Sequence, residues 1–394
     1  MKIILFCLGN ILYAISYVIP KSSKIWIFGS WGGGEFADNP KYFYNYIKEK
    51  QPKIKRIWLT RNKALCEKLK KEGHNIFMCN SFSGIWYSCR AQIGITSHGM
   101  IDLNRFACGR LKIVQTWHGI PLKPILLSDP KKSAISKRRK SALLSKFFLF
   151  LKKELDFNSN LVICSSSDYV TDIMKLCFGK DAPLKNTGFP RLDGIFTPCT
   201  EYMVSKRIQE FKANGKNVGI YMPTYRREGE FDIISLLVSN LLKIEENLKL
   251  NNQVLFLKVH PFEYYKIENL TISENIQLII NDEINGDIYS ILGLFDFLIS
   301  DYSSIIFDYL ILARPIYILA PDREQYITSN GNFVYDYINL DLPVCDSWEQ
   351  LLSLISKSFA EVCSNDISSI SQKIHQNRDA NSCIRLYAFI NKNL

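Results

Sequence analysis

The sequence has none of the cysteine patterns that hold metals or redox pairs. Its eleven cysteines are an odd number, are scattered, and include no C-x-x-C pair. We therefore predict reduced, mostly buried thiols in a cytoplasmic protein and no zinc site. The chain also lacks a G-x-x-x-x-G-K-[ST] loop, a G-x-G-x-x-G fingerprint and a D-x-D motif after a strand. These absences remove the most direct sequence signs of a nucleotide-phosphate loop or a metal-held diphosphate.

Acidic residues are missing from residues 131–153, which contain nine of the 49 Lys and Arg residues. This one segment accounts for most of the formal net charge of +11. Such concentrated charge predicts contact with an anionic surface rather than with a nucleic acid followed along a whole domain. Apolar side chains interleave with the basic ones, so the segment is either an interfacial helix or an amphipathic helix packed on its own domain.

Charge is also absent from the apolar run at residues 3–20. Four residues interrupt the run, namely Gly9, Asn10, Ser16 and Pro20. It barely reaches the roughly 20 residues that span a bilayer, and no small-x-small cleavage site precedes Lys21. We predict that residues 1–23 form a monotopic membrane-associating segment. If the run spans the membrane instead, Lys21 and Lys24 favour a cytoplasmic location for the rest of the chain.

Short apolar runs alternate with amphipathic stretches along most of the 394 residues. Runs without strict polar alternation are typical of strands covered on both faces of a parallel sheet. The predicted strands are 24–30, 54–60, 91–97, 112–119, 161–167, 217–224, 253–261, 276–280, 295–301 and 315–321. The predicted helices include 40–50, 62–72, 168–178, 231–248 and 303–312. The pattern predicts two Rossmann-like, doubly wound α/β domains, 24–197 and 198–394, facing a cleft and separated by a polar linker around 198–216.

Two of the five histidines directly follow predicted strands, His118 in "TWHGIPLK" and His260 in "LKVHP". Ligands of doubly wound sheets bind at the carboxyl ends of strands. One imidazole could therefore accept a proton while the other donates a hydrogen bond to phosphate. The alternative is that each is a structural hydrogen-bonding residue. His98 also ends a predicted strand, in "TSHGMID", and is a further cleft candidate.

Two arginines stand in comparable places. Arg226 follows Pro223 and Thr224 in "YMPTYRRE", at a strand end where a guanidinium can hold phosphate oxygens. The alternative for Arg226 is a surface salt bridge. Arg191 and Asp193 are presented together after the rigid turn of "GFPRLD", and the alternative for them is a purely structural turn.

The stretch "LISDYSSIIFDYL" (298–310) breaks an apolar strand with an acid and two serines before a helix resumes. Backbone N–H groups at such a helix start, with the hydroxyls of Ser303 and Ser304, could bind phosphate. The alternative is that Asp301, Ser303 or Ser304 only caps the helix.

The glycine-containing stretch "FGSWGGGEFADNPKYFYNYI" (28–47) is predicted to be a flexible loop lining the first domain's cleft on the acceptor side.

An ordered set of motifs between about residues 24 and 330 resembles the CDP-glycerol glycerophosphotransferase family of teichoic acid and capsule polymerases. The resemblance implies a GT-B fold. It also implies a reaction in which an acceptor hydroxyl attacks the phosphorus that carries glycerol in CDP-glycerol and expels CMP. Besides the early 28–47 stretch, the motifs are "WHGIPLK" (117–123), "GFPRLD" (188–193), "YMPTYR" (221–226), "LKVHP" (257–261) and "SDYSSIIFDYLILARPIYILAPDREQY" (300–326).

By this resemblance His118 and His260 are the catalytic histidines. The implied donor phosphate and nucleotide positions are Thr224, Arg226, Asp301, Ser303, Ser304 and Asp308. The acceptor or cleft candidates are His98, Gly119, Lys123, Arg191 and Asp193. The chain departs from the usual family pattern at Ile120, where threonine is common, and at Leu192 and Val259, and these departures leave the ionisable residues intact.

The resemblance implies CDP-glycerol or CDP-ribitol as donor and a lipid-linked or polysaccharide acceptor. The expected location is peripheral, at the cytoplasmic face of an anionic membrane, with no nucleic-acid partner. No cofactor is expected, because histidine, arginine and a helix N-terminus suffice to stabilise the developing charge, although a divalent metal is compatible with the site. The alternative function is a GT-B glycosyltransferase that uses a nucleotide sugar in surface polysaccharide synthesis.

Overall fold

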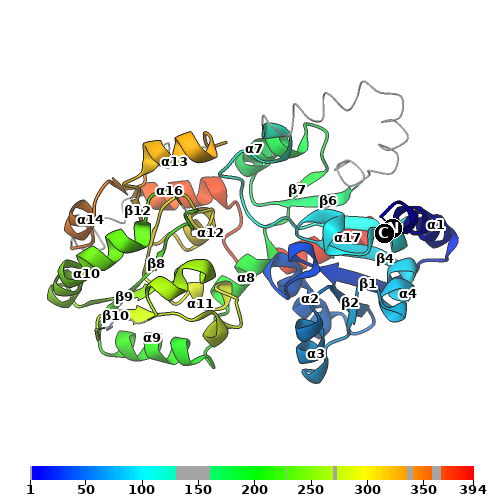
Figure 1. Ribbon diagram of the computed structural model, residues 1–394, viewed down its shortest axis with the longest axis horizontal. Coiled ribbons are helices and arrows are strands. Elements are labelled where there is room, and N and C mark those ends of the chain that lie inside the picture. The colour runs from blue at the N-terminus through cyan, green and yellow to red at the C-terminus, as the bar shows by residue number, and fades with distance from the viewer. Residues whose placement is uncertain (1, 130–159, 228, 269–272, 335–339, 357–364) are drawn as a thin grey trace. The chain divides into compact units, whose positions relative to one another are not determined.

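The computed structural model describes residues 2–129, 160–227, 229–268, 273–334, 340–356 and 365–394. The chain divides into two compact units. Unit 1 consists of Met1–His118, Pro130–Asp193 and Asp379–Leu394, and unit 2 consists of Gly119–Asp129 and Gly194–Arg378. The predicted basic amphipathic segment 131–153 lies outside the described residues. Each unit is built around one parallel sheet (Figure 1).

The sheet of unit 1 has seven parallel strands in the order β3-β2-β1-β4-β5-β6-β7. Chain order runs outward from β1 on one side and restarts at β4 on the other, so the topological switch point lies between β1 and β4. Gly29 pairs with Thr96 at the ends of these two strands, and the residues that follow them therefore start side by side. The strands are β1 (Ser22–Gly29), β2 (Lys55–Thr60), β3 (Ile76–Met78), β4 (Ala91–Thr96), β5 (Lys112–Gln115), β6 (Asn160–Ser165) and β7 (Leu184–Asn186).

Several helices of unit 1 begin at residues whose side chains cap them. Asn62, Ser81 and Ser167 each accept a hydrogen bond from a backbone N–H three residues later. The helices of the unit are α1 (Lys2–Val18), α2 (Asp38–Lys50), α3 (Lys63–Lys71), α4 (Phe82–Arg90), α7 (Asp168–Phe178) and α17 (Ser382–Lys392), and α8 (Pro190–Phe196) continues into unit 2.

The sheet of unit 2 has six parallel strands in the order β10-β9-β8-β11-β12-β13. Its switch point lies between β8 and β11, where Met222 pairs with Ser300 at the strand ends. The strands are β8 (Asn217–Met222), β9 (Gln253–Leu257), β10 (Ile276–Leu278), β11 (Phe297–Ser300), β12 (Ile316–Leu319) and β13 (Val344–Cys345). The helices are α9 (Met203–Ala213), α10 (Ile233–Leu250), α11 (Tyr289–Leu292), α12 (Ile305–Tyr309), α13 (Arg323–Asn330), α14 (Trp348–Ile355) and α16 (Asn365–Ile374).

The apolar runs form strands because both of their faces are covered. The strand residues Phe297, Ile299 and Leu319 are buried against α10 and α14 in one continuous core. Figure 1 shows these two helices neighbouring each other beside the strands of unit 2. Burial on both faces removes the need for polar alternation, which explains why the sequence pattern identified parallel strands.

The α/β prediction is confirmed, and each of the ten predicted strands has a counterpart. The short strands β3, β7 and β13 were not predicted, because they lie in shorter apolar runs than β10, whose three residues belong to the predicted run 276–280. Within the predicted linker, residues 203–213 form α9, which packs on β8 in unit 2 and buries Val204 and Ile208. The predicted range 198–394 also differs from unit 2, since α17 groups with unit 1, where Tyr387 contacts Trp26.

The apolar N-terminal run forms α1, which packs against η3 (Arg105–Ala107) and α4 in unit 1. The contact is close at Gly9, where an added Cβ would lie 2.7 Å from the ring of Phe106 and displace it. The Ser16 hydroxyl accepts a hydrogen bond from the Gly109 N–H at 2.8 Å. Among the described residues, no helix has the length and apolar character needed to cross a membrane.

Candidate active site

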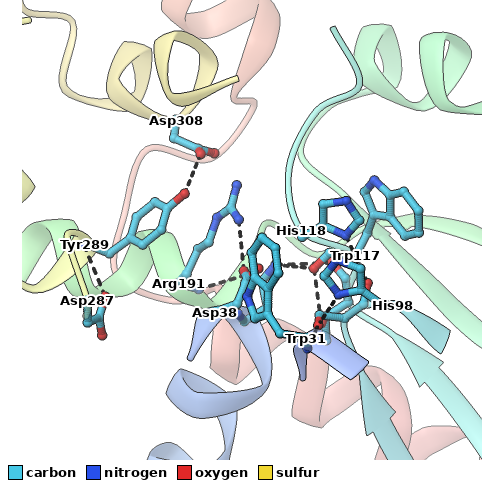
Figure 2. Close-up of polar contacts among 12 residues, drawn as sticks. Trp31, Asp38, His98, Trp117, His118, Arg191, Asp287, Tyr289 and Asp308 are labelled. Carbon is cyan, nitrogen blue, oxygen red and sulfur yellow. Dashed lines mark hydrogen bonds and ion pairs between the residues drawn. The ribbon is translucent and has the colours of Figure 1, made fainter. Parts of the chain in front are cut away.

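Two imidazole rings lie stacked where β4 and β5 end in unit 1. The ring centroids of His98 and His118 are 4.0 Å apart and the ring planes are 3° from parallel; we call these residues the histidine pair. A sharp turn presents His118, with φ of 56° at Trp117 and 130° at Gly119. Glycine adopts such positive φ values at the least cost. Figure 2 shows both rings with Trp31 and Trp117 beside them.

Ser97 orients both rings of the histidine pair. Nδ1 of His118 lies 3.2 Å from the Ser97 carbonyl oxygen. Because a carbonyl oxygen only accepts hydrogen bonds, this contact places a proton on Nδ1 and leaves the lone pair of a neutral ring on Nε2. Nδ1 of His98 lies 2.8 Å from the Ser97 hydroxyl oxygen. The His118 ring is thus arranged to accept a proton at Nε2.

The surroundings favour the neutral form of both rings. Burial lowers the pKa of His118, and the nearby Asp38 carboxylate opposes this effect in part. Burial, together with the adjacent His118 ring, lowers the pKa of His98 to about 4. A neutral imidazole is the form that can take a proton from a hydroxyl, so the electrostatics agree with the tautomer.

Asp102 joins the loops that follow β1 and β4. Its Oδ1 accepts a hydrogen bond from the Gly32 N–H at 2.7 Å. Its Oδ2 accepts from the N–H groups of Ser97 and His98, both at 2.7 Å. The sequence prediction gave this residue no role, although its signal was visible as an acid four residues after His98 in "TSHGMID".

A buried ion pair lies behind the turn that carries His118. Nη1 of Arg191 is 2.9 Å from Oδ1 of Asp38, and the two side chains are only 3% and 4% exposed. Asn39 accepts from the Arg191 N–H at 2.9 Å and donates to the Trp117 carbonyl oxygen at 2.8 Å. The sequence prediction placed Arg191 among acceptor or cleft residues, whereas its side chain is buried within unit 1 and supports the backbone of the His118 turn.

The side chain of Asp193 forms hydrogen bonds with the backbone at the start of α17. Its two carboxylate oxygens accept from the N–H groups of Ser382 and Cys383, each at 2.9 Å. These contacts connect the "GFPRLD" turn to the C-terminal helix of the same unit. The sequence predicted that Asp193 contacts the acceptor. Its carboxylate already accepts hydrogen bonds from the N–H groups at the start of α17, so it would have to make that contact in addition.

Arg226 forms a buried clamp at the carboxyl edge of the unit 2 sheet. Its Nη2 lies 2.8 Å from Oδ2 of Asp301, and its Nε lies 2.8 Å from Oδ2 of Asp322. Nη1 donates to the Thr224 carbonyl oxygen at 2.6 Å. The Arg226 side chain is only 2% exposed. The structure therefore brings the predicted residues Thr224, Arg226 and Asp301 together, but it directs the guanidinium to protein carboxylates.

Two tyrosines and a lysine complete this arrangement. The Arg226 guanidinium lies 4.8 Å from the ring of Tyr302 and 4.9 Å from the ring of Tyr326. Nζ of Lys123 also lies over the Tyr326 ring, 4.9 Å from its centroid. Burial lowers the pKa of Lys123, and Asp301 opposes this effect. Asp322 and Tyr326 belong to the "APDREQY" end of the longest motif, which the sequence prediction quoted without assigning them a role.

Lys258 and His260 follow β9 in the same unit. Nζ of Lys258 donates to the Val259 carbonyl oxygen at 3.4 Å, and no ion pair of Lys258 occurs within the described part of the chain. Burial lowers the Lys258 pKa to about 8. His260 accepts from the Phe262 N–H through Nδ1, at 3.3 Å. A ring that accepts at Nδ1 is neutral and carries its proton on Nε2, so His260 presents a donor where His118 presents an acceptor.

The residues after β11 differ from a simple helix cap. Asp301 accepts from the N–H groups of Thr224 and Tyr302, and Ser304 makes no side-chain capping hydrogen bond to α12. The Ser303 hydroxyl accepts from the Ile305 N–H at a long 3.4 Å. Asp308 is buried and accepts from the Tyr289 hydroxyl at 2.8 Å (Figure 2). The phosphate roles of Ser303, Ser304 and Asp308 stay predictions.

The three departures from the family pattern fall in the core. Ile120 and Leu192 are 1% exposed and Val259 is 4% exposed. Their side chains pack inside the protein, so these substitutions change packing behind the motifs. Among the described residues, no group of three or more His, Cys, Asp or Glu side chains is arranged to hold a metal ion.

Comparisons with known proteins agree on one family. The family described as "CDP-Glycerol:Poly(glycerophosphate) glycerophosphotransferase" matches residues 11–392. The "Teichoic acid poly(glycerol phosphate) polymerase" of Bacillus spizizenii is 26% identical over 357 residues, which cover 89% of this chain and 87% of that protein. The protein of the same name from Staphylococcus epidermidis is 28% identical over 333 residues, and the match covers 81% of this chain but only 43% of that longer protein.

The fold has a counterpart among solved structures. A variant of the wall teichoic acid polymerase TagF, solved after a soak with CDPG, superposes with a TM-score of 0.73 at 21% identity, covering 100% of this chain and 95% of that one. At this identity the likeness concerns the fold alone. It confirms the predicted GT-B type of architecture, built from two parallel α/β sheets.

Proposed function

The chain belongs to the CDP-glycerol:poly(glycerophosphate) glycerophosphotransferase family, and from this premise we propose that it transfers glycerol phosphate from CDP-glycerol to an acceptor hydroxyl. The acceptor is a lipid-linked or polysaccharide chain of a cell-surface polymer such as teichoic acid. Relatives named as poly(glycerol phosphate) polymerases support glycerol over ribitol as the transferred alditol. The enzyme is thus a phosphotransferase, and CMP is its second product.

In the proposed reaction the acceptor oxygen forms a bond to the phosphorus that carries glycerol. The bond between that phosphorus and the bridging oxygen of CMP breaks, and CMP leaves with the bonding electron pair. The acceptor proton passes to Nε2 of His118. The observation that carries this assignment is the contact of His118 Nδ1 with the Ser97 carbonyl oxygen, because it reserves Nε2 for the acceptor hydroxyl.

The donor's phosphates are assigned to unit 2. The Nε2–H of His260 supplies a hydrogen-bond donor, and Lys123 and Lys258 supply positive charge that no described carboxylate neutralises through an ion pair. Developing negative charge on the leaving CMP needs donors fixed in advance. Arg226 takes a different role from the one predicted, because Asp301 and Asp322 already engage it. We assign it to positioning Thr224 and the residues after β11.

We also propose that the protein is peripheral at the cytoplasmic face of an anionic membrane. The solvent-facing side of α1 is apolar, with Leu8, Ile11, Ile15 and Val18 between 49% and 75% exposed. Residues 2–34 contain no acid, and residues 81–112 contain only the buried Asp102. Basic residues lie beside the helix instead, namely Arg105 in the packed element η3 and Arg110, whose guanidinium lies 5.7 Å from the Tyr17 ring. An apolar helix face within a cationic border suits the surface of an anionic bilayer.

A donor panel tests the proposed function. The purified protein is incubated with an acceptor membrane fraction and, separately, with CDP-glycerol, CDP-ribitol and nucleotide sugars, and nucleotide release is measured with and without acceptor. We expect acceptor-dependent CMP release with CDP-glycerol. Release only from a nucleotide sugar would instead support the glycosyltransferase alternative, which the shared GT-B architecture keeps as the competing function.

A further inference from the structure

The loop after β1 holds a tryptophan in a costly backbone conformation. Trp31, Gly32 and Gly33 have φ values of 49°, 65° and 81°. Glycine adopts such values freely, whereas a residue with a bulky side chain does so only when its surroundings enforce it. Strain of this kind concentrates at functional sites, where the position of one side chain matters more than local stability.

Hydrogen bonds from neighbouring elements enforce this conformation. Arg61 donates through Nη1 to the carbonyl oxygens of Gly32 and Ile101, at 2.7 and 2.6 Å. Asp102 accepts from the Gly32 N–H, and the Trp31 N–H donates to the Ser97 hydroxyl at 3.3 Å. The sequence pattern suggested a flexible glycine loop at this place. The contacts show a loop that is tied at several points to the elements that carry the histidine pair.

The indole that this loop presents lies over the histidine pair. Its centroid is 4.7 Å from the His98 ring and 6.0 Å from the His118 ring, an arrangement visible in Figure 2. Trp31 is nevertheless 50% exposed. A large apolar ring beside the proposed base therefore keeps half of its surface open, although burying it would be favourable.

We propose that Trp31 is the stacking platform for the acceptor, which rests the C–H face of a sugar or alditol unit on the indole and directs its hydroxyl toward Nε2 of His118. The inference rests on the proposed function and adds the binding element for the acceptor. A flat, electron-rich ring suits the polarised C–H groups of a polyol, while the polyol's hydroxyls stay free for solvent and for the base. Lys123 and Lys258, which make no ion pair within the described residues, are assigned to the donor in unit 2, which leaves unit 1 for the acceptor.

The test compares Trp31→Ala, Trp31→Phe and Trp31→Gly with the wild type, using a soluble glycerol phosphate oligomer as the acceptor probe. Trp31→Gly is informative because glycine adopts the positive φ without strain, which offsets part of the packing that is lost with the indole. Trp86→Ala is the matched control. Trp86 is also 50% exposed, but it lies on α4 near Arg90.

We expect the alanine and glycine variants to raise the acceptor KM about tenfold, with a smaller increase for phenylalanine, since one stacked aromatic ring contributes on that scale. The donor KM and the pH profile are expected to stay at wild-type values in all variants. An unchanged acceptor KM in Trp31→Gly would overturn the proposal. A raised donor KM would also overturn it. So would a shifted pH profile with a normal acceptor KM, because Trp31 would then only limit the access of solvent to the histidine pair.

A binding readout separates this proposal from the proposed function. Titration with the oligomer is followed by tryptophan fluorescence in the wild type, Trp31→Phe and Trp86→Ala. We expect a signal that Trp31→Phe loses and Trp86→Ala retains. If that pattern appears without any CMP release from CDP-glycerol, the platform stands and the proposed reaction fails. If Trp31→Phe gives the same fluorescence change as the wild type, the platform is wrong whatever the reaction.

Discussion

The rings of His98 and His118 lie parallel at a centroid separation of 4.0 Å, and Ser97 contacts Nδ1 of each. Two imidazoles this close cannot both carry a proton without strong repulsion. The arrangement therefore favours a neutral pair at neutral pH. It also explains why His98, a secondary candidate in the sequence, belongs to the same site as His118.

This geometry predicts the pH dependence of acceptor use. Burial lowers the pKa of His118 below its usual value near 6.5. The proposed base acts in its neutral form, so kcat/KM for the acceptor should be flat through neutral pH and fall only at acidic pH, below that usual value. The measurement is the pH profile of acceptor-dependent CMP release. A loss of activity that already begins on acidification from pH 8 to 7 would contradict the neutral-pair description.

Lys258 and Arg226 should respond oppositely to substitution. Lys258→Met removes a half-buried ammonium that has no ion pair in the described structure, so folding stability should hold or rise while the donor KM increases. Arg226→Ala leaves Asp301 and Asp322 buried without their partner and should destabilise unit 2 by about 3–5 kcal/mol. Thermal unfolding and donor KM are measured for both, with Lys243→Met, at an exposed site on α10, as the control.

The Lys258 pKa of about 8 predicts two opposite trends with rising pH, one in donor affinity and one in folding stability. Below pH 8 the side chain is charged, the form that the proposed contact with the donor's phosphates requires, so donor affinity should weaken as pH rises through 8. Between pH 8 and about 10.5 the unfolded chain binds more protons at this lysine than the folded chain, so this residue's contribution to stability increases with pH. In Lys258→Met both trends should be smaller, and a donor KM with the same pH dependence in the variant would argue against the assignment.

The exposed face of α1 predicts membrane binding. Ile11→Glu with Ile15→Glu places two carboxylates on that face and should reduce flotation with vesicles of anionic lipid. Leu242→Glu is the control, since Leu242 is 78% exposed on α10 in unit 2. Binding that is equal for anionic and zwitterionic vesicles, or equal for the double variant and the control, would refute this surface as the contact.

Asp193 predicts a structural effect where the sequence suggested a substrate contact. Asp193→Ala removes the acceptor for the N–H groups of Ser382 and Cys383 at the start of α17, and the expected cost is about 1 kcal/mol of folding free energy. Asp193→Asn retains one acceptor oxygen and should lose less. Thermal unfolding measures both. A raised acceptor KM with unchanged stability would restore the role predicted from the sequence.

The sequence predicted those features that depend on periodicity and on strand ends. Long apolar strands such as β1 and β9 were visible because burial on both faces leaves a continuous apolar run, and His118 and His260 stood out because they follow such runs. The partner of Arg226 was not visible, because Asp322 lies almost a hundred residues away in the chain. Likewise, the buried state of Arg191 depends on Asp38, which reaches it only through tertiary packing. The packing of α9 on β8 was not visible in the sequence, because the exposed side of this helix is polar, as in a linker.

The most direct test of the proposed reaction is phosphorus NMR of the product formed from CDP-glycerol and acceptor by the wild type, His118→Ala and the control Trp86→Ala. We predict a new phosphodiester signal and an equal amount of CMP from the wild type and the control, with both reduced by about a thousandfold or more in rate when His118 is replaced. A product without a new phosphodiester, or one that His118→Ala forms at the wild-type rate, would contradict it.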